Sequence, residues 1–246
     1  MKKRILYYTV SVLILLSILV FPVQARAGGG GSSSGGGGSS SSHHSSPSSS
    51  GKSNNPFSWI APVGTFGFIV YGTSRVRRKR AKEMNDKVCI ELDKLDDVDS
   101  FWNGKNLNEL IRHCYFEIQN AWSHQNLEAL KDLLTPELYD VWQTKIIWQQ
   151  FRNEKNILKN IQLIKTYIVD VNDQEDDDKD SFWVYIEGKM DDQTIQEDGT
   201  VLEANTDIFV EYWRFCRRDC FILLDEVLQQ EEFENRTFTF RELKNN

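Results

Sequence analysis

The first 82 residues contain no aspartate or glutamate, and this divides the chain into two parts that cannot fold in the same way. They carry 11 of the 29 lysine and arginine residues, so their formal charge is +11. The remaining 164 residues hold all 36 acidic residues and 18 basic ones, which gives a formal charge of −18. A nucleic-acid partner is therefore not expected, because phosphate binding needs a basic surface on the folded part.

Residues 1–27 have the order of a secretory signal: a basic start, a long apolar run and the small-residue triplet Ala25-Arg26-Ala27. The apolar run, Ile5–Val23, is also long enough to span a bilayer as a helix, so a cleaved signal peptide and a signal anchor both stay open. The Gly/Ser-rich residues 28–55 cannot bury enough apolar surface to fold, and we predict a disordered tether there. Its two adjacent histidines predict no metal site.

Residues 56–74 form a second uncharged, largely apolar stretch, which we predict to be a transmembrane segment. Its apolar part is short, so a re-entrant or interfacial segment is the alternative. A basic run in residues 75–83 follows, as expected on the cytoplasmic side of a span, and it predicts a cytoplasmic C-terminal domain. Together with the signal-like N-terminus, which has a bacterial character, this predicts a bacterial cell-membrane protein. We also expect this run to contact anionic lipid headgroups. Its members are Arg75, Arg77, Arg78, Lys79, Arg80 and Lys82.

The acidic part begins with helical periodicity and then changes to strand alternation. Three helices are predicted at 106–124, 127–134 and 135–150, with Thr135 as N-cap of the third. Strands follow at 161–171, 182–187, 207–215 and 221–228, and the acidic loop 172–180 lacks the frame of a calcium loop. Strands without intervening helices imply an antiparallel meander with the helices on one face, an α+β fold.

Two stretches of this pattern resemble the C-terminal domain of the Tim-forty-four-like (Tim44-like) family. They are Leu107–Trp122 with Leu127–Leu138, and Glu211–Phe215 followed by Phe221–Val227. The resemblance covers residues 84–232 and leaves 233–246 as a tail. It implies a cystatin-like, nuclear-transport-factor-two-like fold, in which a curved antiparallel sheet packs on N-terminal helices around an apolar cavity. Bacterial relatives place a signal-like segment, a Gly/Ser-rich stretch and another apolar segment before this domain.

The resemblance implies a membrane-tethered binding or scaffold module for an apolar peptide, a lipid or a membrane or translocating protein, with no cofactor. Protein translocation or membrane-protein assembly is the implied setting. The alternative is a small-molecule enzyme of the isomerase or dehydratase kind, which would need an acid and a base converging in the cavity, for example Glu187 or Glu211. Candidate cavity residues are Trp122, Trp142, Trp183, Glu211, Trp213 and Phe215, although large aromatic side chains are mostly core.

Overall fold

The computed structural model describes residue 27 and residues 60–236 of the chain. A long helix, α2 (Ile60–Asp96), comes first and is followed by one short 3-10 turn, η1 (Ser100–Trp102). Three helices and five strands then follow. They are α3 (Gly104–Ser123), α4 (Leu127–Leu133), α5 (Pro136–Phe151), β1 (Glu154–Asn172), β2 (Ser181–Gln196), β3 (Val201–Asn205), β4 (Phe209–Arg218) and β5 (Phe221–Gln229). A last helical turn occupies residues 230–236.

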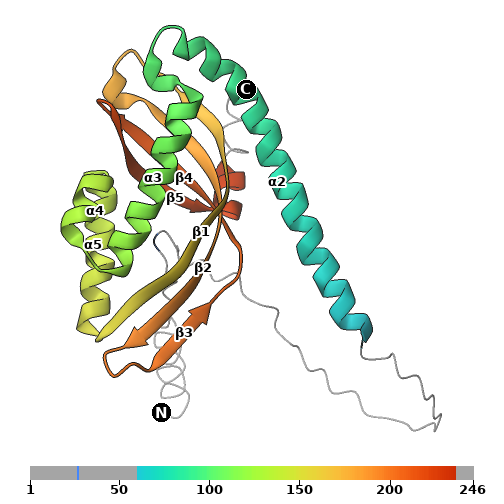
Figure 1. The fold of residues 1–246 in the computed structure, drawn as a ribbon, viewed down its shortest axis with the longest axis vertical. Helices are drawn as coiled ribbons and strands as arrows, with labels where there is room; N and C mark the ends of the chain where they lie inside the picture. Colours follow the sequence, from blue (N-terminus) through green and yellow to red (C-terminus); the bar gives the residue numbers. More distant parts are fainter. Residues whose placement is uncertain (1–26, 28–59, 237–246) are drawn as a thin grey trace, which may run out of the picture.

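The sheet is antiparallel throughout, with the order β1-β2-β4-β5. The central strand β2 pairs with β1 along its whole length, whereas on its other side it pairs first with β4 and then with the short strand β3. Figure 1 shows the long β1 and β2 strands curving past the helices. The α+β class and the antiparallel meander predicted from the sequence are confirmed.

Helices α3, α4 and α5 lie on one side of the sheet, and α2 runs along the other (Figure 1). On the α3 side, which we call the inner face, Trp213 of β4 pairs with Val184 of β2, and both side chains are fully buried. On the opposite side, the outer face, the neighbouring pair is Tyr212 and Tyr185, which are also buried. The three predicted helices therefore do gather on one face, and the structure adds α2 on the other, where large apolar side chains also need cover.

The three central helices begin and end close to where their patterns predict. Asn103 and Asn126 cap α3 and α4 by accepting hydrogen bonds from the N–H groups of Asn106 and Ala129, both at 3.1 Å. Thr135 does occupy the N-cap of α5, but its hydroxyl donates to Asp225 Oδ1 at 3.1 Å instead of capping the helix. That bond ties the start of α5 to strand β5.

The strands are longer than predicted, and β3 was not predicted at all. Pairing between β1 and β2 extends to Glu154 and Gln196, in a segment where polar side chains obscure the alternation. All five residues of β3 are exposed, so that strand has no buried side chains to impose a period of two. The hairpin between β4 and β5 was predicted at the correct place, and Asp219 makes its turn with a φ of 52°.

Within residue 27 and residues 60–236, no helix is both long enough and apolar enough to cross a membrane. Helix α2 includes residues 60–74 of the predicted second apolar segment and continues without a break through the basic run. Three predicted segments lie outside the described residues. They are the signal in residues 1–27, apart from residue 27 itself, the tether in residues 28–55 and the tail after residue 236. The predictions for those parts remain predictions.

Candidate functional site

The inner face of β4 brings together three of the candidate residues. Glu211, Trp213 and Phe215 alternate along the strand, and all three are fully buried. Glu211 accepts a hydrogen bond from the Trp213 indole N–H at 3.0 Å and another from Gln229 Nε2 at 3.3 Å. The sequence prediction that Glu211 points inward is confirmed, and its carboxylate is already engaged by the protein.

Helix α3 supplies the opposite wall of this interior. The ring of Tyr115 lies 5.5 Å from that of Trp213, and the Tyr115 hydroxyl lies over Gly188 of β2. One turn further along α3, the amide of Gln119 is completely buried and has no hydrogen-bond partner among the described residues. Burial also raises the pKa of the nearby Cys114 thiol, on the same helix, to about 11. The interior is therefore apolar with a few fixed polar groups.

Gly188 of β2 leaves room for two side chains that pack on it, Phe209 of β4 and Tyr115 of α3. A Cβ atom at this position would lie 2.5 Å from Phe209 Cζ and 2.8 Å from Tyr115 Oη, and both rings are buried. We expect Gly188→Ala to lower the free energy of unfolding by about 1–3 kcal/mol, as overpacking does. Gly104→Ala is the control, because its Cβ would make only an ordinary contact of 3.9 Å with Leu92. Urea unfolding of both variants measures the difference, and equal midpoints would contradict the expectation.

The other candidate tryptophans lie in two different places. Trp122 of α3 and Trp142 of α5 are buried against each other with ring centroids 5.2 Å apart. Trp183 is on the outer face, where its ring centroid lies 5.3 Å from that of Phe233 and 5.8 Å from the guanidinium carbon of Arg214. The six candidates therefore do not line one common site. Whether any of them contacts a ligand remains a prediction.

Sequence reasoning missed a polar site on the outer face, where the basic run meets the sheet. Arg78 of α2 donates from Nε to Glu187 Oε2 at 2.9 Å and from its terminal nitrogen to Glu187 Oε1. The Tyr185 hydroxyl donates to the same carboxylate at 3.2 Å. The Glu187 side chain is only 6% exposed, so this is a bidentate ion pair with a buried acid. Burial and the charge of Glu187 raise the pKa of Tyr185 well above its usual range.

Apolar contacts and a second ion pair extend this outer-face contact, which we call the α2 clamp. Ala81 of α2 is buried in a cluster with Val169, Tyr185, Tyr212 and Phe233. Phe233 stacks on Tyr212 with ring centroids 3.8 Å apart, and Arg80 pairs with Glu234 at 3.2 Å. Burial raises the pKa of Tyr212 to about 12. The clamp therefore joins α2, the sheet and the last helical turn.

The two acids of the enzyme alternative lie on opposite faces of the sheet. Glu187 pairs with Val210 in the register, whereas Glu211 pairs with Ile186, so their side chains alternate. Each carboxylate also has its own hydrogen-bond donors, from Arg78 and Tyr185 or from Trp213 and Gln229. These two groups do not converge as an acid and base pair in one site.

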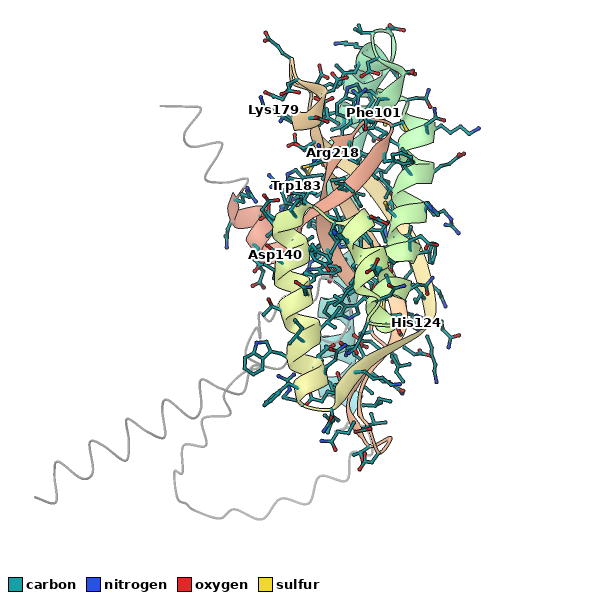
Figure 2. The ribbon with its side chains drawn as sticks, turned by 90° about the vertical axis from the view of Figure 1, so that its left-hand side faces the viewer. Phe101, His124, Asp140, Lys179, Trp183 and Arg218 are labelled. Carbon is teal, nitrogen blue, oxygen red and sulfur yellow. The ribbon has the colours of Figure 1, made fainter. Side chains whose placement is uncertain are left out.

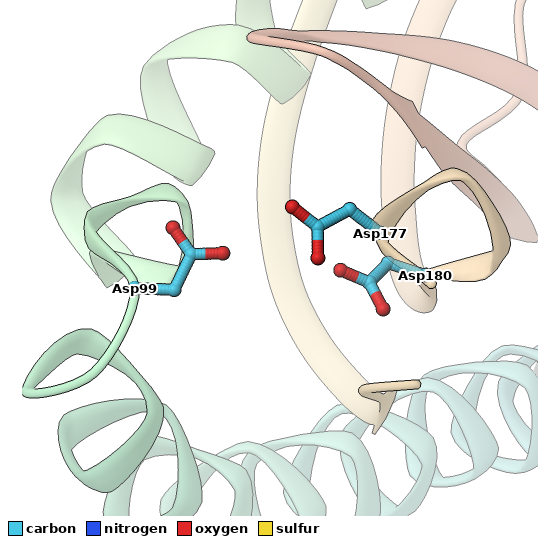
Figure 3. Close-up of side chains that lie close together, drawn as sticks. All are labelled: Asp99, Asp177 and Asp180. Carbon is cyan, nitrogen blue, oxygen red and sulfur yellow. The ribbon is translucent and has the colours of Figure 1, made fainter. Parts of the chain in front are cut away.

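Three aspartates gather at the end of the sheet near the acidic loop. The carboxylates of Asp99, Asp177 and Asp180 come within 4.8 Å of one another, and Figure 3 shows them facing a common point. Arg217 contacts all three: Asp180 at 3.1 Å, Asp177 at 3.2 Å, and Asp99 through the same nitrogen that reaches Asp180. Its guanidinium also lies 4.2 Å from the ring centroid of Phe101. The acids are thus partners of an arginine, and the cluster joins the turn after α2 to the β4–β5 hairpin.

Comparison with known proteins agrees with this architecture. The Tim44-like domain family model matches residues 91–229, which is more than half of the chain. The chain therefore belongs to the Tim44-like domain family. No curated protein sequence matches it. Among solved structures, it is similar to the intermembrane space region of the chloroplast protein ARC6, with a TM-score of 0.36 and 9% sequence identity, over 56% of this chain and 94% of that one.

Proposed function

We propose that the protein is a membrane-tethered binding or scaffold module in which α2 is a rigid arm. The observation that carries this proposal is the α2 clamp. Arg78 and Ala81 of α2 attach to the sheet, while the same helix extends without a break into the predicted membrane segment. A helix rises about 1.5 Å per residue and does not bend freely, so the clamp would fix the orientation of the domain relative to the bilayer.

Charge supports the same arrangement. The acidic part carries −18, so an anionic leaflet repels it within a Debye length of about 8 Å, and the domain needs an anchor to remain at the surface. Three members of the basic run are already paired within the protein: Arg78 with Glu187, Arg80 with Glu234 and Lys79 with Glu83. We therefore assign headgroup contact chiefly to Arg77 and Lys82, whose side chains are exposed. The partner in this proposal is a membrane or translocating protein.

The tether can be tested by placing charge in the second apolar segment. In a chain whose N-terminal signal has been cleaved, the double variant Phe68→Lys, Ile69→Lys is expected to leave the membrane during extraction with alkaline carbonate. The reason is that each lysine at the centre of a membrane span costs roughly 2.5–3.5 kcal/mol. Thr73→Lys, at the edge of the segment, is the control and should leave the chain in the membrane pellet. Retention of the double variant in a chain with a cleaved signal would contradict the tether.

A further inference from the structure

Helix α5 is apolar on both of its sides, unlike α3. Trp142, Ile146 and Gln149 face the interior and are buried. On the opposite side Val141, Ile147, Trp148 and Phe151 are 52%, 53%, 57% and 78% exposed. Figure 2 shows α5 along the outside of the molecule, with Asp140 on its exposed side. A helix with apolar residues on every side is normally buried, so this face calls for a partner.

The spacing of the exposed residues identifies a helix as the fitting partner. Glu137, Val141, Thr144, Trp148 and Phe151 follow one another at intervals of four, three, four and three residues. This spacing places the five side chains in one row along the helix, and a second helix can pack its side chains between those of such a row. All five side chains are exposed, and we call this row the α5 seam. The rings of Trp148 and Phe151 contact each other with centroids 5.9 Å apart.

The α5 seam is held rigidly from behind. Gln149 on the buried side of α5 donates to Asn156 Oδ1 at 2.5 Å, and Asn156 Nδ2 donates to Thr194 Oγ1 at 3.0 Å. These bonds connect α5 to β1 and β2, and the Thr135–Asp225 bond fixes its other end. A surface whose side chains are already positioned loses less conformational entropy when it binds.

The charges and side-chain sizes along the α5 seam are complementary to those of a second α5 seam that runs in the opposite direction. The N-terminal end carries Glu137 and Asp140, and the C-terminal end is followed by Lys155 and by Arg152, which also pairs with Glu154 of its own chain at 2.8 Å. If two α5 helices run antiparallel with Thr144 near the centre, Glu137 lies opposite Arg152 and the small Val141 lies opposite Trp148. A parallel pair would place like charges together.

We propose that the α5 seam is a self-association surface, which packs antiparallel against the same seam of a second copy of the chain. The contact is isologous, so one two-fold axis passes close to Thr144. The three apolar side chains of the seam make a small interface in each copy, and the net charge of −18 on each acidic part opposes it. The association is therefore weak, and it grows with local protein concentration.

Cysteine cross-linking of the full-length chain in detergent tests this arrangement. The exposed cysteines are first removed by Cys89→Ser and Cys220→Ser, and Thr144→Cys is then introduced next to the proposed axis. Oxidation is expected to give a disulfide-linked dimer at least tenfold faster than in the Asp132→Cys control, an exposed position on α4. Adding Trp148→Asp to the Thr144→Cys chain should remove this advantage, while the urea midpoint stays unchanged because Trp148 is exposed.

The direction of packing has its own test. A mixture of Val141→Cys chains and Trp148→Cys chains should form mixed disulfides faster than either chain forms with itself, because these positions face each other only in the antiparallel register. Rates for Thr144→Cys equal to those of the Asp132→Cys control, or rates insensitive to Trp148→Asp, would overturn the proposal. Faster disulfide formation within each single variant than in the mixture would overturn the antiparallel packing. None of these results depends on membrane tethering, so failure here and failure of the tether are distinguishable.

Discussion

Arg78→Ala is expected to lower the free energy of unfolding by roughly 2–4 kcal/mol, since it leaves a buried carboxylate without its counter-charge. Glu187 is 6% exposed, and after the change the Tyr185 hydroxyl still donates to it at 3.2 Å. The loss should stay below that of a fully buried pair, because the Arg78 side chain is 48% exposed and water can approach from its side. Urea unfolding of the full chain in detergent measures this difference.

Arg77→Ala is the matched control for the clamp. Arg77 neighbours Arg78 in the same helix and is exposed, so its removal should change the free energy of unfolding by less than about 0.5 kcal/mol. The Arg78→Leu, Glu187→Leu double variant should recover most of the stability that Arg78→Ala loses, because it removes both charges together. Equal unfolding midpoints for Arg78→Ala and Arg77→Ala would show that the clamp contributes nothing.

Loosening of α2 should also be visible by proteolysis. Trypsin cuts after the basic residues of this helix only when the helix opens locally, because an intact helix does not fit a protease active site. Arg78→Ala is expected to accelerate cleavage near Lys82, while the cleavage rate within the sheet changes less. Uniform acceleration at all sites would indicate global destabilisation instead of release of the arm.

The elements that the sequence predicts well are those with one buried face. Helix α3 places Leu107, Ile111, Cys114 and Ile118 on a single buried side, so its period was unambiguous and its bounds differ from the prediction by at most two residues. Strand β4 alternates in the same way, which is why the inward direction of Glu211 could be predicted. Family membership was predicted from these same segments and is confirmed.

The outer-face site was missed because its residues look ordinary in the sequence. Arg78 stands in a run of basic residues, and such a run indicates a solvated or lipid-facing surface unless its partner is known. One signal was available in β2, where Trp183 and Tyr185 alternate with Phe182 and Val184, so that both faces of the strand carry large apolar groups. Such a strand is covered on both sides, and this predicts a second layer.

The exposed side of α5 was missed for a related reason. Large aromatic side chains were expected to be mostly core, whereas the structure places Trp148 57% exposed. Apolar residues occur around the whole of α5, so periodicity alone cannot tell which side faces the sheet. The side is set by tertiary contacts, such as those of Gln149 and Asn156, which a single sequence does not reveal.

Arg217→Ala is expected to destabilise the domain more than Arg78→Ala does. The Arg217 side chain is 11% exposed and the Asp180 side chain is 1% exposed, so removal of the guanidinium leaves a buried carboxylate beside two others. We expect the free energy of unfolding to fall by about 3–5 kcal/mol at neutral pH, as for other broken buried pairs. Arg217→Lys should recover only part of this loss, because an ammonium cannot reproduce the planar contacts to several acids.

The neighbouring Arg218→Ala is the control for this prediction, because Arg218 is 55% exposed and its pair with Asp178 is 3.7 Å long. Its removal should cost less than about 0.5 kcal/mol, as expected for a surface ion pair. Far-UV circular dichroism of both variants at 25 °C would confirm that the comparison is made between folded proteins. Similar losses for the two arginines would contradict the importance of the buried cluster.

The loss of stability caused by Arg217→Ala should also depend on pH in a defined direction. The backbone N–H of Phe101, and secondarily Arg217, hold the pKa of Asp99 below its usual value, whereas burial raises the pKa of Asp180 and Arg217 only partly offsets this. A carboxyl group whose pKa is lowered by folding stabilises the fold above its unfolded-state pKa, and this stabilisation is lost as the pH falls. A carboxyl group whose pKa is raised by folding stabilises the fold below its unfolded-state pKa, and this stabilisation is lost as the pH rises.

Without Arg217 the pKa values of both Asp99 and Asp180 move upward, so the variant loses stability at neutral pH and regains it on acidification. Urea midpoints measured as the pH is lowered from 7 should therefore move toward those of the wild-type chain, first as Asp180, whose pKa is raised, takes up a proton, and only at lower pH as Asp99, whose pKa is lowered, does so. A deficit that stays constant across this range would show that lost packing against Phe101, and not the three carboxylates, accounts for the effect.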